Sequence, residues 1–150
     1  MSVHADRDSA VRTAMAPDAI RAIERDGAEA YPHECCGALI ADGEVIVEAF
    51  ALPNTTGGEP RRRFLIGPAD YRLAESRACE RGGTLVGFYH SHPDHPARPS
   101  QHDLEHAWPN MTYVIVSVAN GVPGDITAWH LRDDRSAFDQ GELTSWRTEC

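Results

Sequence analysis

The sequence predicts an α/β fold in which helices flank a mixed β-sheet. Three observations lead to this prediction: helical patterns over residues 17–30 and 68–81, hairpin turns at Asp42-Gly43 and Asn120-Gly121, and a nearly continuous apolar run over residues 85–89. A short run of this kind is typical of a strand that is buried on both faces of a sheet.

One domain accounts for the chain. Its 150 residues, of which 41% are hydrophobic and 25% charged, have the composition of an ordinary globular domain. We expect residues 1–14 to form a disordered lead-in, because disorder concentrates at chain termini, and residues 15–150 to form a single domain.

In the first half of the chain, a helix is predicted over residues 17–30. Pro17 fits its first turn, and Pro32 lies just past its end. A strand over residues 37–40, a turn and a strand over residues 45–47 then predict a hairpin. Residues 53–63, with their glycines and prolines, are the most loop-like stretch of the chain.

The second half of the chain contains most of the predicted strands. The glycine pair at 82–83 ends one helix, and Pro109 stops the next. The expected elements are, in order, a short strand over 64–66, a helix over 68–81, a strand over 85–89, a helix over 100–107, strands over 113–118 and 126–131, and a weak strand near 137–143.

The charge balance argues against one class of partner. The net charge is −9, from 23 acidic and 14 basic residues, whereas proteins that bind nucleic acid need a basic footprint. The one basic cluster, Arg61 to Arg63, is too short to reverse this. No apolar run approaches the roughly 18–20 residues of a membrane span. We therefore expect neither nucleic acid nor a membrane as a partner.

Cysteine usage and the N-terminal segment indicate a cytoplasmic protein. The segment from Met1 to Arg12 lacks the apolar region of a secretory signal. The cysteines, at positions 35, 36, 79 and 150, have no C-x-x-C spacing and form no disulfide framework. We expect four free thiols in a reducing compartment.

The predicted chemistry lies in a histidine-rich segment. His90 and His92 follow the apolar run over 85–89, and side chains two residues apart point to the same face of a strand. Two converging imidazoles form half of a site for a borderline metal such as zinc. The nearby His95, His102 and His106 are expected to face solvent.

The helix that begins near residue 100 contributes a candidate third ligand. Ser100 and Asp103 fit a capping box, which alone would explain both residues. The same cap places Asp103 in the first helical turn, from which its carboxylate can reach the two histidines. Three protein ligands with one open position are the arrangement of a catalytic zinc site, which activates water near neutral pH. Such a water needs a base, and Glu34 is the candidate.

Together these residues resemble the JAMM (MPN+) metalloprotease family. The shared pattern is His90-x-His92-Pro93, six further residues, Ser100-x-x-Asp103, and Glu34 far upstream at a helix-to-strand junction. The runs Glu-Cys-Cys-Gly at 34–37 and Tyr-His-Ser-His-Pro at 89–93 are similar to the small bacterial branch of that family. The resemblance covers roughly residues 17–132.

The resemblance implies a fold, a cofactor and a role for each residue. The fold is a JAMM/MPN core, similar to that of cytidine deaminases, with a curved mixed sheet. His90, His92 and Asp103 match ligands of one Zn²⁺ per chain, Glu34 matches the general acid/base, and Ser100 matches the hydroxyl that steadies the tetrahedral oxyanion.

The resemblance also implies a substrate class. The family hydrolyses peptide or isopeptide bonds just beyond the C-terminal Gly-Gly of ubiquitin or ubiquitin-like proteins. Its small bacterial members look like partners of ubiquitin-like sulfur carriers, and there the bond cleaved can join the carrier to a cysteine. In this chain, residues 53–63 are the candidate substrate flap.

Two other functions stay open on the sequence alone. Residues 90–95 also match H-x-H-x-D-H, the pattern of binuclear metallo-β-lactamase-like hydrolases, although little chain follows it for that fold. The second alternative is a non-catalytic MPN-type scaffold, although no ligand position is substituted here. The oligomeric state is also open, and a homo-oligomer is compatible with the sequence.

Overall fold

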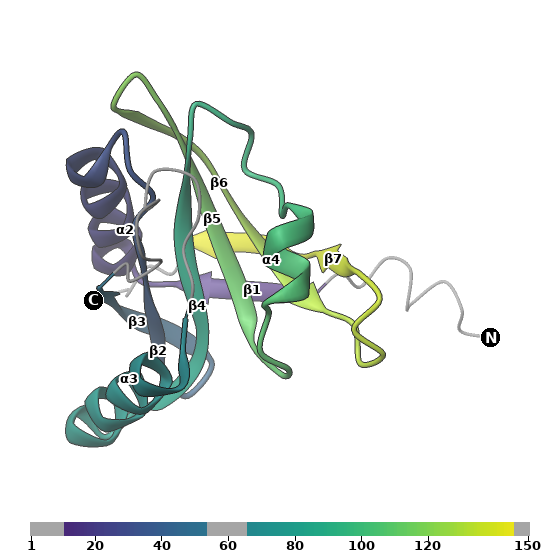
Figure 1. Ribbon diagram of the computed structural model, residues 1–150. Helices are drawn as coiled ribbons and strands as arrows, with labels where there is room; N and C mark the ends of the chain where they lie inside the picture. Colours follow the sequence, from purple (N-terminus) through teal and green to yellow (C-terminus); the bar gives the residue numbers. More distant parts are fainter. Residues whose placement is uncertain (1–10, 54–65, 146–150) are drawn as a thin grey trace.

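Eight strands form one mixed sheet in the computed structural model, which describes residues 11–53 and 66–145 (Figure 1). The spatial order of the strands is β7-β6-β5-β4-β2-β3-β1-β8. The strands are β1 (Arg12–Met15), β2 (Cys36–Asp42), β3 (Val45–Leu52), β4 (Thr84–Pro93), β5 (Thr112–Ala119), β6 (Val122–Leu131), β7 (Phe138–Gln140) and β8 (Glu142–Ser145). The helices are α2 (Pro17–Ala30), α3 (Pro68–Arg81) and α4 (Gln101–Glu105).

The sheet is mixed, as predicted. Strand β4 pairs antiparallel with β2 and parallel with β5, and β1 pairs parallel with both β3 and β8. The two predicted hairpins are present as the antiparallel pairs β2–β3 and β5–β6. The parallel pair β4–β5 requires a crossover, and the segment that contains α4 forms it.

The sheet curls until its two edges meet. Strands β7 and β8 stand at opposite ends of the strand order, yet only Gly141 separates them in the chain. The Gly141 N–H donates to the Ala128 oxygen on β6, and the Glu142 N–H donates to the Val11 oxygen next to β1. One residue therefore joins both edges, and the predicted curved sheet is nearly a barrel.

Two hydrophobic cores cover the two faces of the sheet. The first contains Met15 of β1, Ile23 of α2 and Tyr89 of β4, whereas the second contains Ala74 of α3 and Phe88 of β4. The neighbours Phe88 and Tyr89 belong to different cores because successive strand residues point to opposite faces. Since His90 and His92 share the parity of Phe88, they lie on the face that α3 covers.

The two long helices have their predicted bounds, and the other elements differ mainly in length. Strand β4 continues past the predicted 85–89 to Pro93, so both histidines lie within the strand. Helix α4 is shorter than the predicted 100–107 and spans Gln101–Glu105 with Ser100 as its N-cap. The weak strand predicted near 137–143 is two short strands, because the chain passes from one sheet edge to the other at Gly141.

Strand β1 corrects the expectation for the N-terminal segment. Residues 12–14 were expected to belong to a disordered lead-in, but they form a strand between β3 and β8. Four residues carry too little periodicity to indicate a strand, and both partner strands are distant in sequence. The rest of the lead-in up to residue 10, the predicted strand residues 64 and 65, and the loop residues 54–63 lie outside the described residues.

Two smaller expectations can also be compared with the structure. Cys35 and Cys36 are buried free thiols and Cys79 is an exposed one, as expected, whereas Cys150 lies outside the described residues. No helix in residues 11–53 and 66–145 is long and apolar enough to cross a membrane.

Candidate metal centre

Strand β4 places two histidines on one buried face. His90 pairs with Cys36 of β2 on one side and with Ile115 of β5 on the other, so it lies in the interior of the sheet. His90 exposes 1% of its surface and His92 exposes 8%. Because the two residues are separated by one position, their rings lie side by side, with centroids 4.9 Å apart.

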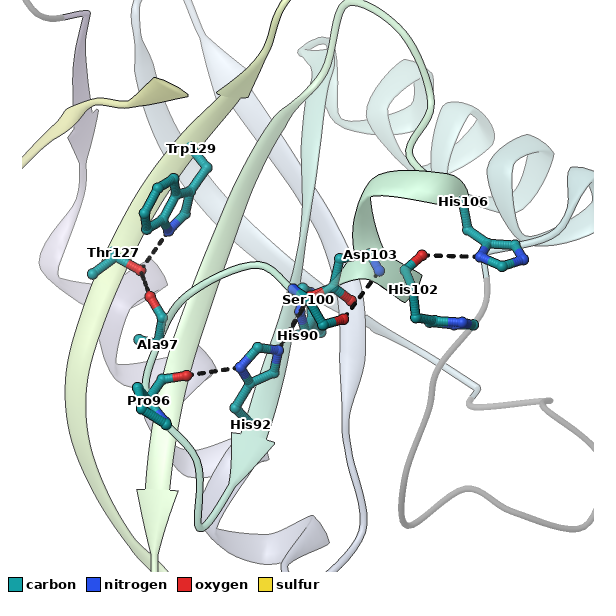
Figure 2. A network of polar contacts seen from close by, with 10 residues as sticks. All are labelled: His90, His92, Pro96, Ala97, Ser100, His102, Asp103, His106, Thr127 and Trp129. Carbon is teal, nitrogen blue, oxygen red and sulfur yellow. Dashed lines mark hydrogen bonds and ion pairs between the residues drawn. The ribbon is translucent and has the colours of Figure 1, made fainter. Parts of the chain in front are cut away.

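The N-terminus of α4 brings a carboxylate to these imidazoles (Figure 2). Asp103 is 7% exposed, and its Oδ2 lies 3.3 Å from His90 Nε2 and 3.2 Å from His92 Nε2. The two Nε2 atoms are 3.1 Å apart. The same Asp103 Oδ2 accepts a hydrogen bond from the Ser100 N–H at 2.8 Å. The structure thus brings together the three side chains that the sequence predicts as candidate ligands.

The protonation states of the three side chains suit a cation. His92 Nδ1 lies 2.8 Å from the carbonyl oxygen of Pro96, which can only accept, so Nδ1 carries the proton and Nε2 presents a lone pair. Burial lowers the pKa of His90 and favours its neutral form. Burial would raise the pKa of Asp103, but His90, His92 and the Ser100 N–H outweigh it and lower that pKa, so the carboxylate is ionised.

The donor set fits zinc. Three potential ligand atoms converge within 3.3 Å of one another, and such an arrangement is unfavourable unless a proton or a cation lies among them. Two imidazole nitrogens and one carboxylate oxygen match the ligands of catalytic zinc sites. His90, His92 and Asp103 can therefore hold a zinc ion.

Glu34 lies close to this cluster because the chain before β2 runs antiparallel to the end of β4. The Cys35 N–H donates to Ser91 Oγ at 2.9 Å, and the Ser91 N–H donates to the Cys35 oxygen at 3.1 Å. These bonds place the preceding Glu34 beside the end of β4. Burial, and secondarily repulsion from Asp103, raises the pKa of Glu34 to about 9.

Comparison with known proteins identifies the family. Residues 16–132 match the family described as prokaryotic homologs of the JAB domain. The chain belongs to the prokaryotic JAB family. This match covers most of the chain and confirms the JAMM/MPN resemblance that the motif predicted.

Two relatives and one solved structure are similar to this JAB domain. The chain is 36% identical over 105 residues to a desampylase from Haloferax volcanii, which covers 68% of this chain and 76% of the relative. It is 33% identical over 124 residues to tail tip assembly protein K of Escherichia phage N15, which covers 83% of this chain but 44% of the phage protein. The chain therefore spans less than half of the length of that second relative.

A solved structure shares the fold. The JAB1/MPN domain protein from Archaeoglobus fulgidus superposes with a TM-score of 0.59 over 89% of this chain and 98% of its own, at 18% identity. At that identity the likeness concerns the fold alone. It agrees with the curved mixed sheet and flanking helices that the JAMM/MPN resemblance implied.

A binuclear site would need Asp94 and His95 of the H-x-H-x-D-H pattern, but neither belongs to the cluster of His90, His92 and Asp103 in this JAB domain. The Asp94 carboxylate accepts hydrogen bonds from the Tyr31 hydroxyl at 2.7 Å and from the Asn120 N–H at 3.0 Å, and His95 is exposed. Within residues 11–53 and 66–145, the only group of three or more potential ligands is His90, His92 and Asp103. The H-x-H-x-D-H pattern is thus not used as in a metallo-β-lactamase.

The remaining histidines of the window lie on or near the surface. His106 is exposed, as predicted, but His102 is partly buried, because its ring stacks on that of His106 with centroids 4.2 Å apart. A pocket of about 290 Å³ lies beside Ser100. Its lining consists of Arg98, Pro99, Ser100, Gln101, Leu104, Trp129, Ala137 and Phe138.

Sequence reasoning missed the groups that orient His92. The acceptor of its Nδ1 proton is the main-chain oxygen of Pro96, and every residue carries such an oxygen, so no sequence signal marks it. Ser117 and Thr127 hold the same loop, yet they are ordinary polar residues of strands β5 and β6. The only hint in the sequence that other groups orient His92 was the length of the connection between β4 and α4.

Proposed function

We propose that this JAB domain is a zinc-dependent peptidase that cleaves the peptide or isopeptide bond after the C-terminal Gly-Gly of a ubiquitin-like protein. The convergence of His90 Nε2, His92 Nε2 and Asp103 Oδ2 within 3.3 Å carries the proposal. The family membership and the relative named as a desampylase support a hydrolase over a scaffold, because all three ligand positions are retained and assembled.

In the proposal, His90, His92 and Asp103 hold one zinc ion per chain. A bound zinc ion supplies Lewis acidity, which polarises a carbonyl group and lowers the pKa of water to near neutrality. The protein contributes a dry, preorganised cradle, since all three side chains are buried. Outer contacts fix two of the ligands: Pro96 orients His92, and the Ser100 N–H orients Asp103.

Glu34 acts as the general base and then as the general acid. Its raised pKa of about 9 describes the protein without a cation, and a positive charge nearby would favour the ionised carboxylate. The carboxylate then takes a proton from the attacking water and delivers it to the nitrogen of the leaving group. Cleavage of an amide bond requires this second transfer, because an amine leaves only after protonation.

Ser100 stabilises the oxyanion. Its Oγ accepts a hydrogen bond from the Asp103 N–H at 3.1 Å, which orients the hydroxyl and leaves its own hydrogen available for donation. A donor held in place before the reaction stabilises the charge that develops on the scissile carbonyl oxygen.

The pocket beside Ser100 favours a leaving group with a free carboxylate. Arg98 lines it, and its guanidinium forms no ion pair with any residue in the described ranges. A cysteine joined to the C-terminus of a sulfur carrier carries a terminal carboxylate that can pair with this arginine. A lysine side chain in an isopeptide bond has none next to the scissile bond. We therefore propose a sulfur-carrier adduct of cysteine as the preferred substrate.

One experiment tests the chemistry and the leaving group together. The zinc-loaded protein is incubated with a sulfur carrier ending in Gly-Gly-Cys and, separately, with a Gly-Gly-lysine conjugate. The masses of the products are then measured by mass spectrometry. We expect loss of cysteine from the first substrate to be the faster reaction. Cleavage of neither substrate would overturn the proposed activity, and preferential cleavage of the lysine conjugate would overturn the proposed leaving group.

Two variants link that activity to the site. Asp103→Ala should lose both zinc and hydrolysis, whereas Glu34→Ala should keep the zinc and lose hydrolysis. The zinc content of each purified variant is measured by inductively coupled plasma mass spectrometry. Hydrolysis that persists in either variant at the wild-type rate would contradict the assignment of that residue.

A further inference from the structure

The segment between β4 and α4 is held at three successive carbonyl groups. Residues 94–100 contain no helix or strand, yet the Ser117 hydroxyl donates to the His95 oxygen at 2.7 Å. His92 Nδ1 donates to the next oxygen, that of Pro96, at 2.8 Å. The Thr127 hydroxyl donates to the third, that of Ala97, at 2.7 Å. The acceptor of His92 therefore lies between two carbonyls that β5 and β6 hold.

Thr127 is itself oriented by a neighbour on the same strand (Figure 2). Trp129 Nε1–H donates to Thr127 Oγ1 at 2.8 Å, so the hydroxyl accepts from the indole and directs its hydrogen to Ala97. Ala97 is 5% exposed, and an oxygen buried there needs a donor. The chain of contacts thus runs from Trp129 through Thr127 to the backbone beside Pro96.

The start of the segment is fixed independently. The Asp94 N–H donates to the Val118 oxygen at 2.7 Å, and its carboxylate accepts from Tyr31 and Asn120. Three prolines, at 93, 96 and 99, further restrict the backbone. A segment fixed in this way presents the Pro96 oxygen in one place.

We propose that Thr127 and Ser117 are positioning residues for the metal site. By holding the carbonyls on either side of Pro96, they keep the Pro96 oxygen where it selects the His92 tautomer with the proton on Nδ1. Only that tautomer presents the Nε2 lone pair to the point where His90 and Asp103 converge. This inference rests on the metal site of the proposed function.

The alternative tautomer explains why the position of Pro96 matters. With the proton on Nε2, His92 would direct an N–H group at the site and would have no lone pair there to bind a cation. An imidazole in this tautomer has to move its proton from Nε2 to Nδ1 before Nε2 can bind a cation, and this requirement weakens metal affinity. Loss of such an outer hydrogen bond typically weakens metal binding by about 10–100-fold.

The test compares two variants of similar size. Thr127→Val removes the hydroxyl at nearly constant volume, and Thr127→Ser retains it. Zinc affinity is measured by competition with a chromophoric chelator. We expect Thr127→Val to bind zinc about 10-fold or more weakly and Thr127→Ser to bind like the wild type. Equal affinities of Thr127→Val and the wild type, or an equal loss in both variants, would overturn the inference.

A second measurement does not depend on zinc. In metal-free protein labelled with ¹⁵N, long-range proton–nitrogen correlation spectra report which His92 nitrogen carries the proton. We expect the Nδ1–H tautomer in the wild type and in Thr127→Ser, and a mixture of tautomers in Thr127→Val. An unchanged tautomer in Thr127→Val would contradict the inference even if zinc affinity fell, because the loss would then have another cause.

Ser117→Ala provides an independent arm if Thr127→Val does not fold. It removes the donor to the His95 oxygen from a partly exposed position on β5, and the same tautomer shift and weaker zinc binding are expected. A wild-type protein that binds no zinc would overturn the proposed metal site itself. If the wild type binds zinc and the Ser117→Ala variant binds it equally well with an unchanged His92 tautomer, the positioning role alone is overturned.

Discussion

Ser100 and Asp103 cap each other at the start of α4. The Asp103 N–H donates to Ser100 Oγ at 3.1 Å, and the Ser100 N–H donates to Asp103 Oδ2 at 2.8 Å. The carboxylate oxygen that closes this capping box is the same one that lies 3.2–3.3 Å from the two histidines. Helix capping and the proposed metal site therefore share one carboxylate oxygen, Asp103 Oδ2.

Ser100→Ala separates the two roles by their magnitudes. Loss of the cap should lower the free energy of unfolding by about 1 kcal/mol. Loss of the oxyanion donor should lower kcat by about 100- to 1,000-fold. Chemical denaturation and steady-state kinetics measure the two effects, and zinc content serves as a control that should not change. A kcat close to that of the wild type, despite the lower stability of the variant, would argue against a role in the oxyanion site.

Glu34 predicts the pH dependence of stability in the metal-free protein. Its pKa in the folded state is about 9, above the ordinary value of 4.5, so folding favours the protonated form. The stabilising contribution is complete below pH 4.5 and is lost as the pH rises through 9. Within that window the free energy of unfolding should fall by up to about 1.4 kcal/mol per pH unit. Urea denaturation of chelator-treated protein from pH 5 to pH 9 measures this slope.

Glu34→Gln is the matched variant for that slope. Glutamine resembles the protonated carboxyl group and does not titrate, so the variant should lose this part of the pH dependence and be more stable than the wild type at pH 9. Saturating zinc should also flatten the slope of the wild type, because a cation favours the ionised carboxylate. Parallel slopes in wild type and variant would show that Glu34 keeps an ordinary pKa.

The sequence predicts the fold where patterns are local and fails where partners are distant. Helix α2 begins at Pro17. Helix α3 ends before Gly82, which adopts a left-handed conformation, and both signals can be read from the sequence. Strand β1 escapes prediction because four residues pair with strands about 30 and 130 positions away. The passage from β7 to β8 at Gly141 escapes for the same reason.

The cluster of candidate ligands could be predicted from the sequence, but the contacts that support it could not. His90, His92 and Asp103 lie close together in sequence, and strand and helix geometry alone brings their side chains to one point. Glu34 required the family pattern, because by itself it is an ordinary acid at the end of a helix. Thr127 contacts this site only through the oxygen of Ala97, and such a contact exists only in the folded chain.

Gly87 tests the packing that holds β4 against β5. A Cβ atom at this position would overlap the carbonyl oxygen of Thr112 on the neighbouring strand. Gly87→Ala should therefore separate the strands three residues before His90 and lower the free energy of unfolding by about 3 kcal/mol or more. Gly124→Ala in β6 is the control, since its nearest contact is an ordinary 3.8 Å. Equal stability of the two variants in thermal denaturation would contradict this account.

Arg98 predicts a dependence on the leaving group. If its guanidinium pairs with the terminal carboxylate of a departing cysteine, Arg98→Gln should lower kcat/KM for a Gly-Gly-Cys carrier about tenfold, which corresponds to about 1.4 kcal/mol. The same carrier ending in a cysteine carboxamide should be cleaved equally by wild type and variant, because neither can form the ion pair. Arg72→Gln is the matched control, since Arg72 is exposed, forms no ion pair in the described ranges and does not line the pocket. A loss of similar size on both substrates would instead indicate that Arg98 supports the pocket wall.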